Sequence, residues 1–417
     1  MSEEKPSLSA EKALHLLEKH ERDAPGTLSS RTDAGDDVLR YLAQNGAVAT
    51  RSAVAANPTT PADANLSLAN DAAETVRSVL AAKIGKLFPG MFIAEEEHLR
   101  NLAIQTLERL AADEAVRVRK VLAEEIKLLD CIPKQVITRL AQDAHSEVSS
   151  PVAEFSPLLT DDDLIELVAA AETNAVMNAV ARRKGLTDRV SDAVIATQDT
   201  GVVTTLLKNV DASIRKQTLD KLVTQAAEVA EWHGPLVMRT ELSPRAVKRL
   251  SAFVTTALVR TLVARNNIDE KTQALLTKRL QERRRLAQDL RPGVELNSEE
   301  SDALADVEMA ARSGLLNDSF VARAIEERHR ETVICALARL NNINDKVVRT
   351  LLEANSAKAI TALVWKAGLN MRTAYNIQTT VMRLPADQLM SARDGTEFPM
   401  TEEEMRWHLS YVGLEKQ

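Results

Sequence analysis

An internal repeat in the first third of the chain constrains the fold more than any other feature. Residues 68–84, LANDAAETVRSVLAAKI, align with residues 110–126, LAADEAVRVRKVLAEEI, at an offset of 42 positions. The two copies share aliphatic, acidic and basic positions, namely Leu68/Leu110, Asp71/Asp113, Val76/Val118, Arg77/Arg119, Val79/Val121, Leu80/Leu122, Ala81/Ala123 and Ile84/Ile126. A fixed period of this length is typical of stacked supersecondary units, each of which buries its apolar face against the next.

A degraded third copy begins 30 residues after the second. Its matching places are held by Leu140, Ala141, Asp143, Val148 and Ala153. Ser149 stands where the first two copies have an arginine, and Pro151 falls inside the second helix of the unit. Because proline removes a backbone donor and clashes with the preceding turn, we expect Pro151 to interrupt that helix.

The repeated aspartate and arginine have a physical interpretation. Asp71 and Asp113 follow a Leu-Ala helix end, where a carboxylate can cap the next helix by accepting a backbone N–H, and such a cap is worth about 1 kcal/mol. The helix that follows repeats its aliphatic residues at the three-and-four spacing of one buried stripe. Arg77 and Arg119 lie within reach of the turn, so each can pair with the aspartate of its own unit or of a neighbouring unit.

A second pattern recurs wherever one later helix is predicted to end and the next to begin. It occurs in ARRKGLTDRV (181–190), ARNNIDEKT (264–272), ARLNNINDKV (338–347) and WKAGLNMRT (365–373), with a looser copy at 314–317. Each copy has a residue suited to the left-handed helix-closing conformation, then an aliphatic residue, then a capping residue. The closing residues are Gly185, Asn267, Asn342 and Gly368, and the capping residues are Thr187, Asp269, Asn344 and Asn370. Such short turns predict antiparallel neighbouring helices.

Composition supports an all-α chain. Gly and Pro number only 13 each among 417 residues, and aromatic residues make up 3% although 45% of the chain is hydrophobic. The core must therefore be built from Ala, Leu, Val and Ile, which fits closely packed helices and disfavours sandwiches and barrels. Because one compact core rarely grows beyond about 300 residues, we expect growth by repeats, that is, an α-solenoid of antiparallel helix pairs.

The repeats resemble known helical families. The pattern LA-x-D-x(4)-VR-x-VLA at 68–81 and 110–123 resembles HEAT-type and leucine-rich-variant repeats. The segments AVARRKGLTDRVSDAVIATQDTGVVTTLLKNVDA (179–212), CALARLNNINDKVVRTLL (335–352) and ALVWKAGLN (362–370) resemble an uncharacterised bacterial family, domain-of-unknown-function family 2336. The likeness covers about residues 36–390, and it implies an α-solenoid of HEAT-like antiparallel helix pairs without implying an activity.

The HEAT-type resemblance also implies a ladder. In such repeats the turn aspartate and the helix arginine pair between neighbouring units, which maps onto Asp71, Arg77, Asp113 and Arg119. Ser149 would break the ladder in the third copy. Regular stacking is therefore not expected at the third copy.

The expected organisation has five segments. They are an N-terminal helix and flexible segment (1–35), HEAT-like repeats (36–156), two further runs of helical repeats (157–291 and 292–385) and a C-terminal capping segment (386–417). Thr160 is placed to cap the helix after a break expected around 149–157, and Thr401 begins a capping box with Glu404. The terminal helix through Trp407 is expected to seal the end of the stack.

Charge and targeting signals favour a soluble cytoplasmic protein. The net charge of −7 gives no general attraction to nucleic acid or anionic lipid. The first residues, MSEEKPSLSAEK, lack the order of a secretory signal, and no uncharged apolar stretch reaches the ~18–20 residues that span a bilayer. Cys131 and Cys335 lie 204 residues apart in apolar helical patterns, where we interpret them as reduced thiols.

Possible metal ligands are weighed against simpler interpretations. Glu95-x-x-His98 and Glu326-x-x-His329 match the carboxylate–histidine step of di-iron bundles, which also need two more inward glutamates and four long helices. The acidic run 161–163 directly follows Thr160, so we interpret it as a favourable interaction with a helix dipole. The other histidines have no ligand spacing; they are His15, His20, His145, His233 and His408. We predict no metal, no cofactor and no catalytic residue.

The densest basic cluster is a possible docking patch. It comprises Lys278, Arg279, Arg283, Arg284 and Arg285, and a smaller one comprises Arg182, Arg183 and Lys184. A solvated helix face is the default interpretation, and docking of an acidic partner or of a phosphate is the alternative. Isolated tryptophans are interpreted as packing residues at corners, namely Trp232, Trp365 and Trp407.

Two classes of function follow. The first hypothesis is a non-enzymatic scaffold or adaptor that binds a protein partner in bacterial signalling or regulation, because repeats are present and Gly-rich phosphate loops, nucleophile elbows and paired-cysteine motifs are absent from the sequence. The second is a HEAT-like protein that binds or modifies nucleic acid through the cluster at 278–285, against which the net charge argues. A lyase that acts on a bound cofactor stays a third alternative. Nothing in the sequence indicates the partner or the oligomeric state.

Overall fold

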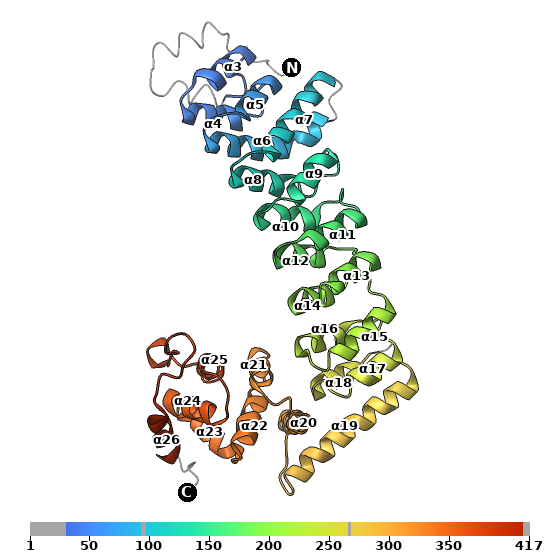
Figure 1. Ribbon diagram of the computed structural model, residues 1–417, viewed down its shortest axis with the longest axis vertical. Coiled ribbons are helices and arrows are strands. Elements are labelled where there is room, and N and C mark those ends of the chain that lie inside the picture. Colours follow the sequence, from blue (N-terminus) through green and yellow to red (C-terminus); the bar gives the residue numbers. More distant parts are fainter. Residues whose placement is uncertain (1–30, 93–96, 266–267, 412–417) are drawn as a thin grey trace, which may run out of the picture. The chain divides into compact units, whose positions relative to one another are not determined.

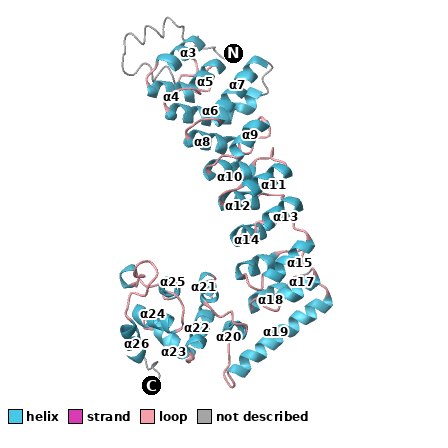
Figure 2. Cartoon of the chain, in the orientation of Figure 1, coloured by secondary structure: helices cyan, strands magenta, loops and turns pink. Residues whose placement is uncertain are grey.

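A computed structural model describes residues 31–92, 97–265 and 268–411. Within these ranges the chain forms 24 α-helices and no strand, which confirms the all-α prediction (Figure 2). Two compact units divide the chain, residues 1–218 and residues 219–417. The boundary falls inside the expected segment 157–291, and the five-segment division stays a prediction.

The first unit consists of short helices in close succession. They are α3 (Asp36–Asn45), α4 (Val48–Ala56), α5 (Ala62–Leu68), α6 (Glu74–Phe92), α7 (Glu97–Ala111), α8 (Val116–Ile126), α9 (Lys134–Ala141), α10 (Ser146–Phe155), α11 (Asp161–Ala170), α12 (Asn174–Arg182), α13 (Asp188–Ala196) and α14 (Thr200–Lys208). Most helices pack on a sequence neighbour and on the next helix but one, and α6, α8, α10, α12 and α14 follow one another in a row (Figure 1). This packing between neighbours fits a solenoid.

The buried stripes that hold this row together are those of the repeat. In α8 the buried residues are Val118, Leu122, Ala123 and Ile126, at the spacing of one helix face. Small residues such as Ala123 allow the neighbouring helix backbone to approach closely. The repeated aliphatic positions therefore determine which face of each helix packs against the next.

Pro151 does not interrupt its helix, contrary to expectation. Helix α10 runs through it from Ser146 to Phe155. Because Pro151 lies in the second turn, the helix loses a single backbone hydrogen bond near its start. The neighbouring Val152 and Ala153 are completely buried, and this packing outweighs the loss.

The second unit begins as a similar row and ends in a shared core. Its elements are α15 (Lys216–Gln225, beginning in the last residues of the first unit), η1 (Ala230–Trp232), α16 (His233–Met238), α17 (Pro244–Leu250), α18 (Thr256–Val263), α19 (Glu270–Leu290), α20 (Ser298–Arg312), α21 (Asp318–Glu326), α22 (Arg330–Asn341), α23 (Asp345–Glu353), α24 (Ala357–Lys366), α25 (Met371–Asn376), η2 (Ile377–Val381), η3 (Ala386–Gln388) and α26 (Glu402–Tyr411). Helices α16, α18, α20, α22 and α24 pack on one another in turn, whereas α21 also contacts the distant α25. From α20 to α26 one hydrophobic core surrounds α24.

The last helix packs on this core, but not through its tryptophan. Helix α26 lies against α24 and buries Met405 and Leu409. Trp407 is 60% exposed, so its interpretation as a packing residue is wrong. It lies two residues from each buried side chain and therefore on the opposite face of the helix.

The predicted helix-ending turns are confirmed where the structure describes them. Gly185, Asn342 and Gly368 have φ of 65°, 54° and 73°, and Asn267 lies outside the described residues. The backbone N–H groups of later residues donate to the side chains of Thr187, Asp269, Asn344 and Asn370. The capping boxes that begin at Thr160 and Thr401 are also present.

The sequence analysis expected no membrane-spanning segment and two reduced cysteines. Among the described residues no helix is long and apolar enough to cross a membrane. Cys131 and Cys335 are both free thiols. Burial raises the pKa of Cys335 to about 12, so this thiol is unreactive at neutral pH.

Candidate functional site

The repeated arginines and aspartates meet between units. The Nε and Nη2 atoms of Arg77 donate to the two carboxylate oxygens of Asp113 at 2.6 and 2.9 Å. The third nitrogen, Nη1, donates to the backbone carbonyl of Asp71 at 2.7 Å. Each arginine thus joins the turn before its own helix to the turn of the next unit.

The ladder has two members that sequence reasoning did not include. Arg51 pairs with Asp71, and Arg119 pairs with Asp143. Asp143 was visible in the degraded third copy, and Arg51 lies 26 residues before Arg77 in the sequence. The described ladder therefore has three rungs, Arg51–Asp71, Arg77–Asp113 and Arg119–Asp143.

Each aspartate of the ladder also holds its own turn. The backbone N–H of Ala73 donates to Asp71 at 2.8 Å, and that of Ala115 donates to Asp113 at 2.8 Å. Although burial alone would raise the pKa of Asp71, hydrogen bonds from Arg51 and from the Ala73 N–H lower it below its usual value. The carboxylates of the ladder therefore hold neighbouring helices together and are already hydrogen-bonded within the protein.

At Ser149 the ladder ends but the stack does not. The Ser149 hydroxyl donates to the carbonyl of His145 in its own helix. From here the rungs connect turn to turn: Arg183 donates to the Ser156 carbonyl 27 residues earlier, and Asn209 donates to the Arg183 carbonyl 26 residues earlier. The units are thus about 27 residues long beyond α10, a shorter period that the sequence analysis missed.

The predicted docking patch on α19 is not one surface. Lys278 and Arg285 are exposed, but Arg279 donates to the Ser251 hydroxyl at 2.6 Å and Arg283 is buried. Arg284 lines a separate cavity of 580 Å³ between α18, α19 and the start of α20. Lys278 and Arg285 are seven positions apart and share one face of α19, whereas Arg279 and Arg283 lie toward the α17–α18 turn.

Arg283 instead belongs to a buried ion pair that closes the α17–α18 turn. It donates to the carbonyls of Ser251 and Val254 and lies 3.6 Å from Asp306 of α20. Asp306 accepts hydrogen bonds from the N–H and hydroxyl of Thr256, at the start of α18. Burial raises the pKa of Asp306 to about 6, and burial lowers that of Arg283.

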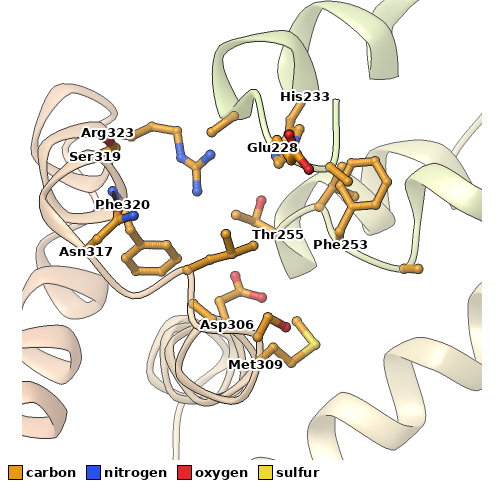
Figure 3. A pocket seen from close by; sticks show the side chains of 17 residues that line it. Glu228, His233, Phe253, Thr255, Asp306, Met309, Asn317, Ser319, Phe320 and Arg323 are labelled. Carbon is orange, nitrogen blue, oxygen red and sulfur yellow. Dashed lines mark hydrogen bonds between the residues drawn. The ribbon is translucent and has the colours of Figure 1, made fainter. Parts of the chain in front are cut away.

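Two cavities flank this ion pair and form the candidate site. One has a volume of 170 Å³ and is bounded by the turns before α16 and α18 and by α20 and α21. The other has a volume of 440 Å³ and extends along α20 to the turn between α21 and α22. They share four wall residues: Thr255, Asp306, Phe320 and Arg323. In the smaller cavity the Arg323 guanidinium points from α21 across the space toward Glu228 and His233 (Figure 3).

His233 contributes a neutral wall group. Its Nε2 atom lies 2.6 Å from the carbonyl of Ala226, which requires a proton on Nε2 and leaves Nδ1 as an acceptor. Burial lowers the pKa of His233 to about 4. Within the described residues Nδ1 has no hydrogen-bond partner. Eight of the 17 residues that line this cavity are polar or charged, so polar and apolar side chains form its wall together.

The residues considered above as possible metal ligands do not form a metal site among the described residues. Glu95 lies outside the described residues, and Glu326 and His329 are both exposed. The three aspartates at 161–163 bond in three directions, to Thr187, Arg189 and Thr160. No group of three or more potential ligands occurs in the described part of the chain.

Comparison with known proteins gives a family. The model of the family described as "Uncharacterised protein conserved in bacteria (DUF2336)" matches residues 148–408. No curated protein matches the chain. The match begins in α10, where the 27-residue period starts, so the likeness is shorter at its N-terminal end than the sequence analysis expected. It covers more than half of the 417 residues, and the chain therefore belongs to this uncharacterised bacterial family, DUF2336.

Proposed function

We propose that this chain is a non-enzymatic cytoplasmic scaffold or adaptor of HEAT-like helical repeats that binds a protein partner. The stack of the first unit supports the proposal, because repeated helix pairs create an extended surface with equivalent positions along it. The Arg–Asp ladder supports a HEAT-like type of repeat, since it joins the turns of successive units.

One observation carries the proposal, a row of exposed apolar side chains at the ends of the even-numbered helices. Leu128 follows α8 and is 68% exposed, Phe155 ends α10, and Val210 follows α14 and is 71% exposed. Each lies at, or within two residues of, the C-terminal end of an even-numbered helix of the first unit. We call Leu128, Phe155 and Val210 the turn edge. Exposed apolar surface is where protein partners commonly bind when it is contiguous, so we propose that a partner covers these side chains together.

The basic cluster argues for this proposal over nucleic-acid binding. Phosphate binding needs several cations on one face. Arg279 and Arg283 are instead engaged by the α17–α18 turn.

The test compares affinity purifications from native cell extract. Wild type should recover a specific protein that Leu128→Ser and Phe155→Ser lose. The control is Leu99→Ser on α7, which removes a similarly exposed leucine away from the turn edge. Binding of the recovered protein, purified, is then measured by calorimetry, where we expect at least a tenfold loss for the edge variants alone. Equal recovery by all four proteins would contradict the proposal, as would the absence of any specific protein.

A further inference from the structure

Two oppositely charged side chains face each other across the smaller cavity. The Arg323 guanidinium extends from α21 toward Glu228 and His233 on the opposite wall (Figure 3). Among the described residues neither Arg323 nor Glu228 forms an ion pair. The two charges are therefore apart, and the cavity space between them is open to a ligand.

The wall around Glu228 offers hydrogen-bond acceptors. His233 follows Glu228 in the sequence and begins α16. Burial lowers the pKa of His233 to about 4, and the charge of Arg323 acts in the same direction, so the ring is neutral at pH 7. Its Nδ1 atom is an acceptor without a partner among the described residues. A carboxylate and a ring nitrogen on one wall suit an ammonium group, which donates hydrogen bonds and carries a positive charge.

The opposite wall presents a guanidinium group. Arg323 lies over the ring of Phe320, with its guanidinium carbon 5.6 Å from the ring centroid. Stacking uses the face of the guanidinium and leaves its N–H edge free. The forked N–H groups match the two oxygens of a carboxylate. This wall therefore suits a carboxylate.

The charges on the cavity wall balance. Among the described residues the charged members of this wall are Glu228, Asp306 and Arg323. Asp306 is already bonded to Thr256 and lies 3.6 Å from Arg283, so its charge is compensated within the protein. One anion and one cation remain. A ligand with a net charge would leave one of them without a partner in the cavity, whereas a zwitterion can pair with both.

The space beside these charges is small and partly apolar. Its volume is 170 Å³, and a cavity of about 150 Å³ is large enough for a benzene molecule. Phe253, Met309 and Phe320 line it. It adjoins the cavity of 440 Å³, with which it shares four wall residues, and we call the two the joined cavities. A ligand with one short aliphatic side chain beside its charged groups fits this space.

We propose that the smaller cavity binds a free α-amino acid with an aliphatic side chain of the size of leucine. Arg323 binds its carboxylate, Glu228 binds its ammonium group, and the side chain packs against Phe320. A free amino acid carries both charged groups on one carbon atom, whereas an internal residue of a peptide carries neither. This site lies in the second unit and the turn edge lies in the first, so either proposal can fail while the other stands.

The test is calorimetric titration of the full-length protein with four probes at pH 7. L-leucine carries both charges and the side chain, N-acetyl-L-leucine lacks the ammonium group, L-leucinamide lacks the carboxylate, and glycine lacks the side chain. We expect L-leucine to bind at least tenfold more tightly than each of the other three. Absence of leucine binding, or equal affinity for any of the other probes, would overturn the proposal.

Two variants assign the charged groups. Arg323→Gln and Glu228→Gln should each weaken leucine binding at least tenfold. Arg323→Gln should also abolish the preference for leucine over leucinamide, and Glu228→Gln should abolish the preference over N-acetylleucine. The reason is that each variant removes the partner of the group that the corresponding probe lacks.

A matched control removes charges elsewhere. Lys278→Gln/Glu282→Gln takes one charge of each sign from exposed positions of α19 outside the joined cavities. Tryptophan fluorescence on heating checks that each variant is folded. Equal leucine binding by the folded cavity variants and the control would place the ligand elsewhere and refute the assignment.

Discussion

Removing the carboxylate of Asp113 should destabilise the first unit strongly. In Asp113→Ala the Arg77 guanidinium, whose side chain is only 9% exposed, loses both bonds to the carboxylate and keeps those to the backbone carbonyls before α6. A buried charge left without its partner costs about 3–5 kcal/mol. The same substitution also removes the hydrogen bond from the Ala115 N–H to Asp113. We expect the free energy of unfolding to fall by about 3–5 kcal/mol in total.

The other rungs provide a graded control. Arg119 is 13% exposed and Arg51 is 20% exposed, so water can replace more of the lost bonds there. We therefore expect Asp143→Ala to cost less than Asp113→Ala, and Asp71→Ala to cost least, about 1–2 kcal/mol. The double variant Arg77→Met/Asp113→Ala should recover about 2 kcal/mol relative to Asp113→Ala, because no orphaned charge remains.

Urea unfolding measures these differences. All three tryptophans, Trp232, Trp365 and Trp407, lie in the second unit. Circular dichroism follows both units, whereas tryptophan fluorescence follows the second and serves as an internal reference. The reasoning is refuted if Asp71→Ala costs as much as Asp113→Ala, or if the double variant is no more stable than Asp113→Ala.

Two further predictions concern single buried or strained positions. Burial lowers the pKa of Lys83 to about 7. Between pH 7 and 10.5 the unfolded chain therefore holds a proton on Lys83 that the folded chain has released. The contribution of Lys83 to the free energy of unfolding rises with pH over this range and is lost as pH falls through 7. The free energy of unfolding of wild type relative to Lys83→Met should accordingly increase from pH 7 to pH 10, and a pH-independent difference would contradict the assignment. Gly185→Ala should cost about 1 kcal/mol in urea unfolding, because φ is +65° while nothing lies within 4 Å of an added Cβ; an unchanged midpoint would show that the turn relaxes.

Local patterns predicted more of the fold than of the candidate site. The recurring Asp and Arg predicted contacts at the turns, but they left open whether Arg77 pairs within its unit or with Asp113 of the next. The change of period after α10 was missed because its connections run through backbone carbonyls, as from Arg183 to Ser156. Because every residue has a backbone carbonyl, the sequence does not indicate which one accepts such a hydrogen bond, and only the structure identifies these contacts.

The burial of Arg283 illustrates the same limit. Its neighbours in sequence are charged, which predicts a solvated face. Its environment is set by Asp306 and by the turn that ends at Thr256, 23 and 27 residues away. The joined cavities depend on the same long-range contacts, so no local motif could reveal them.

The ladder makes the first unit modular. Every described rung has an arginine on the earlier helix pair and an aspartate on the later one. If one helix pair were removed or duplicated, the new junction would again bring an arginine of the earlier pair next to an aspartate of the later pair. This architecture is therefore compatible with insertion or deletion of whole helix pairs, because the Arg–Asp contacts between neighbouring pairs can form again.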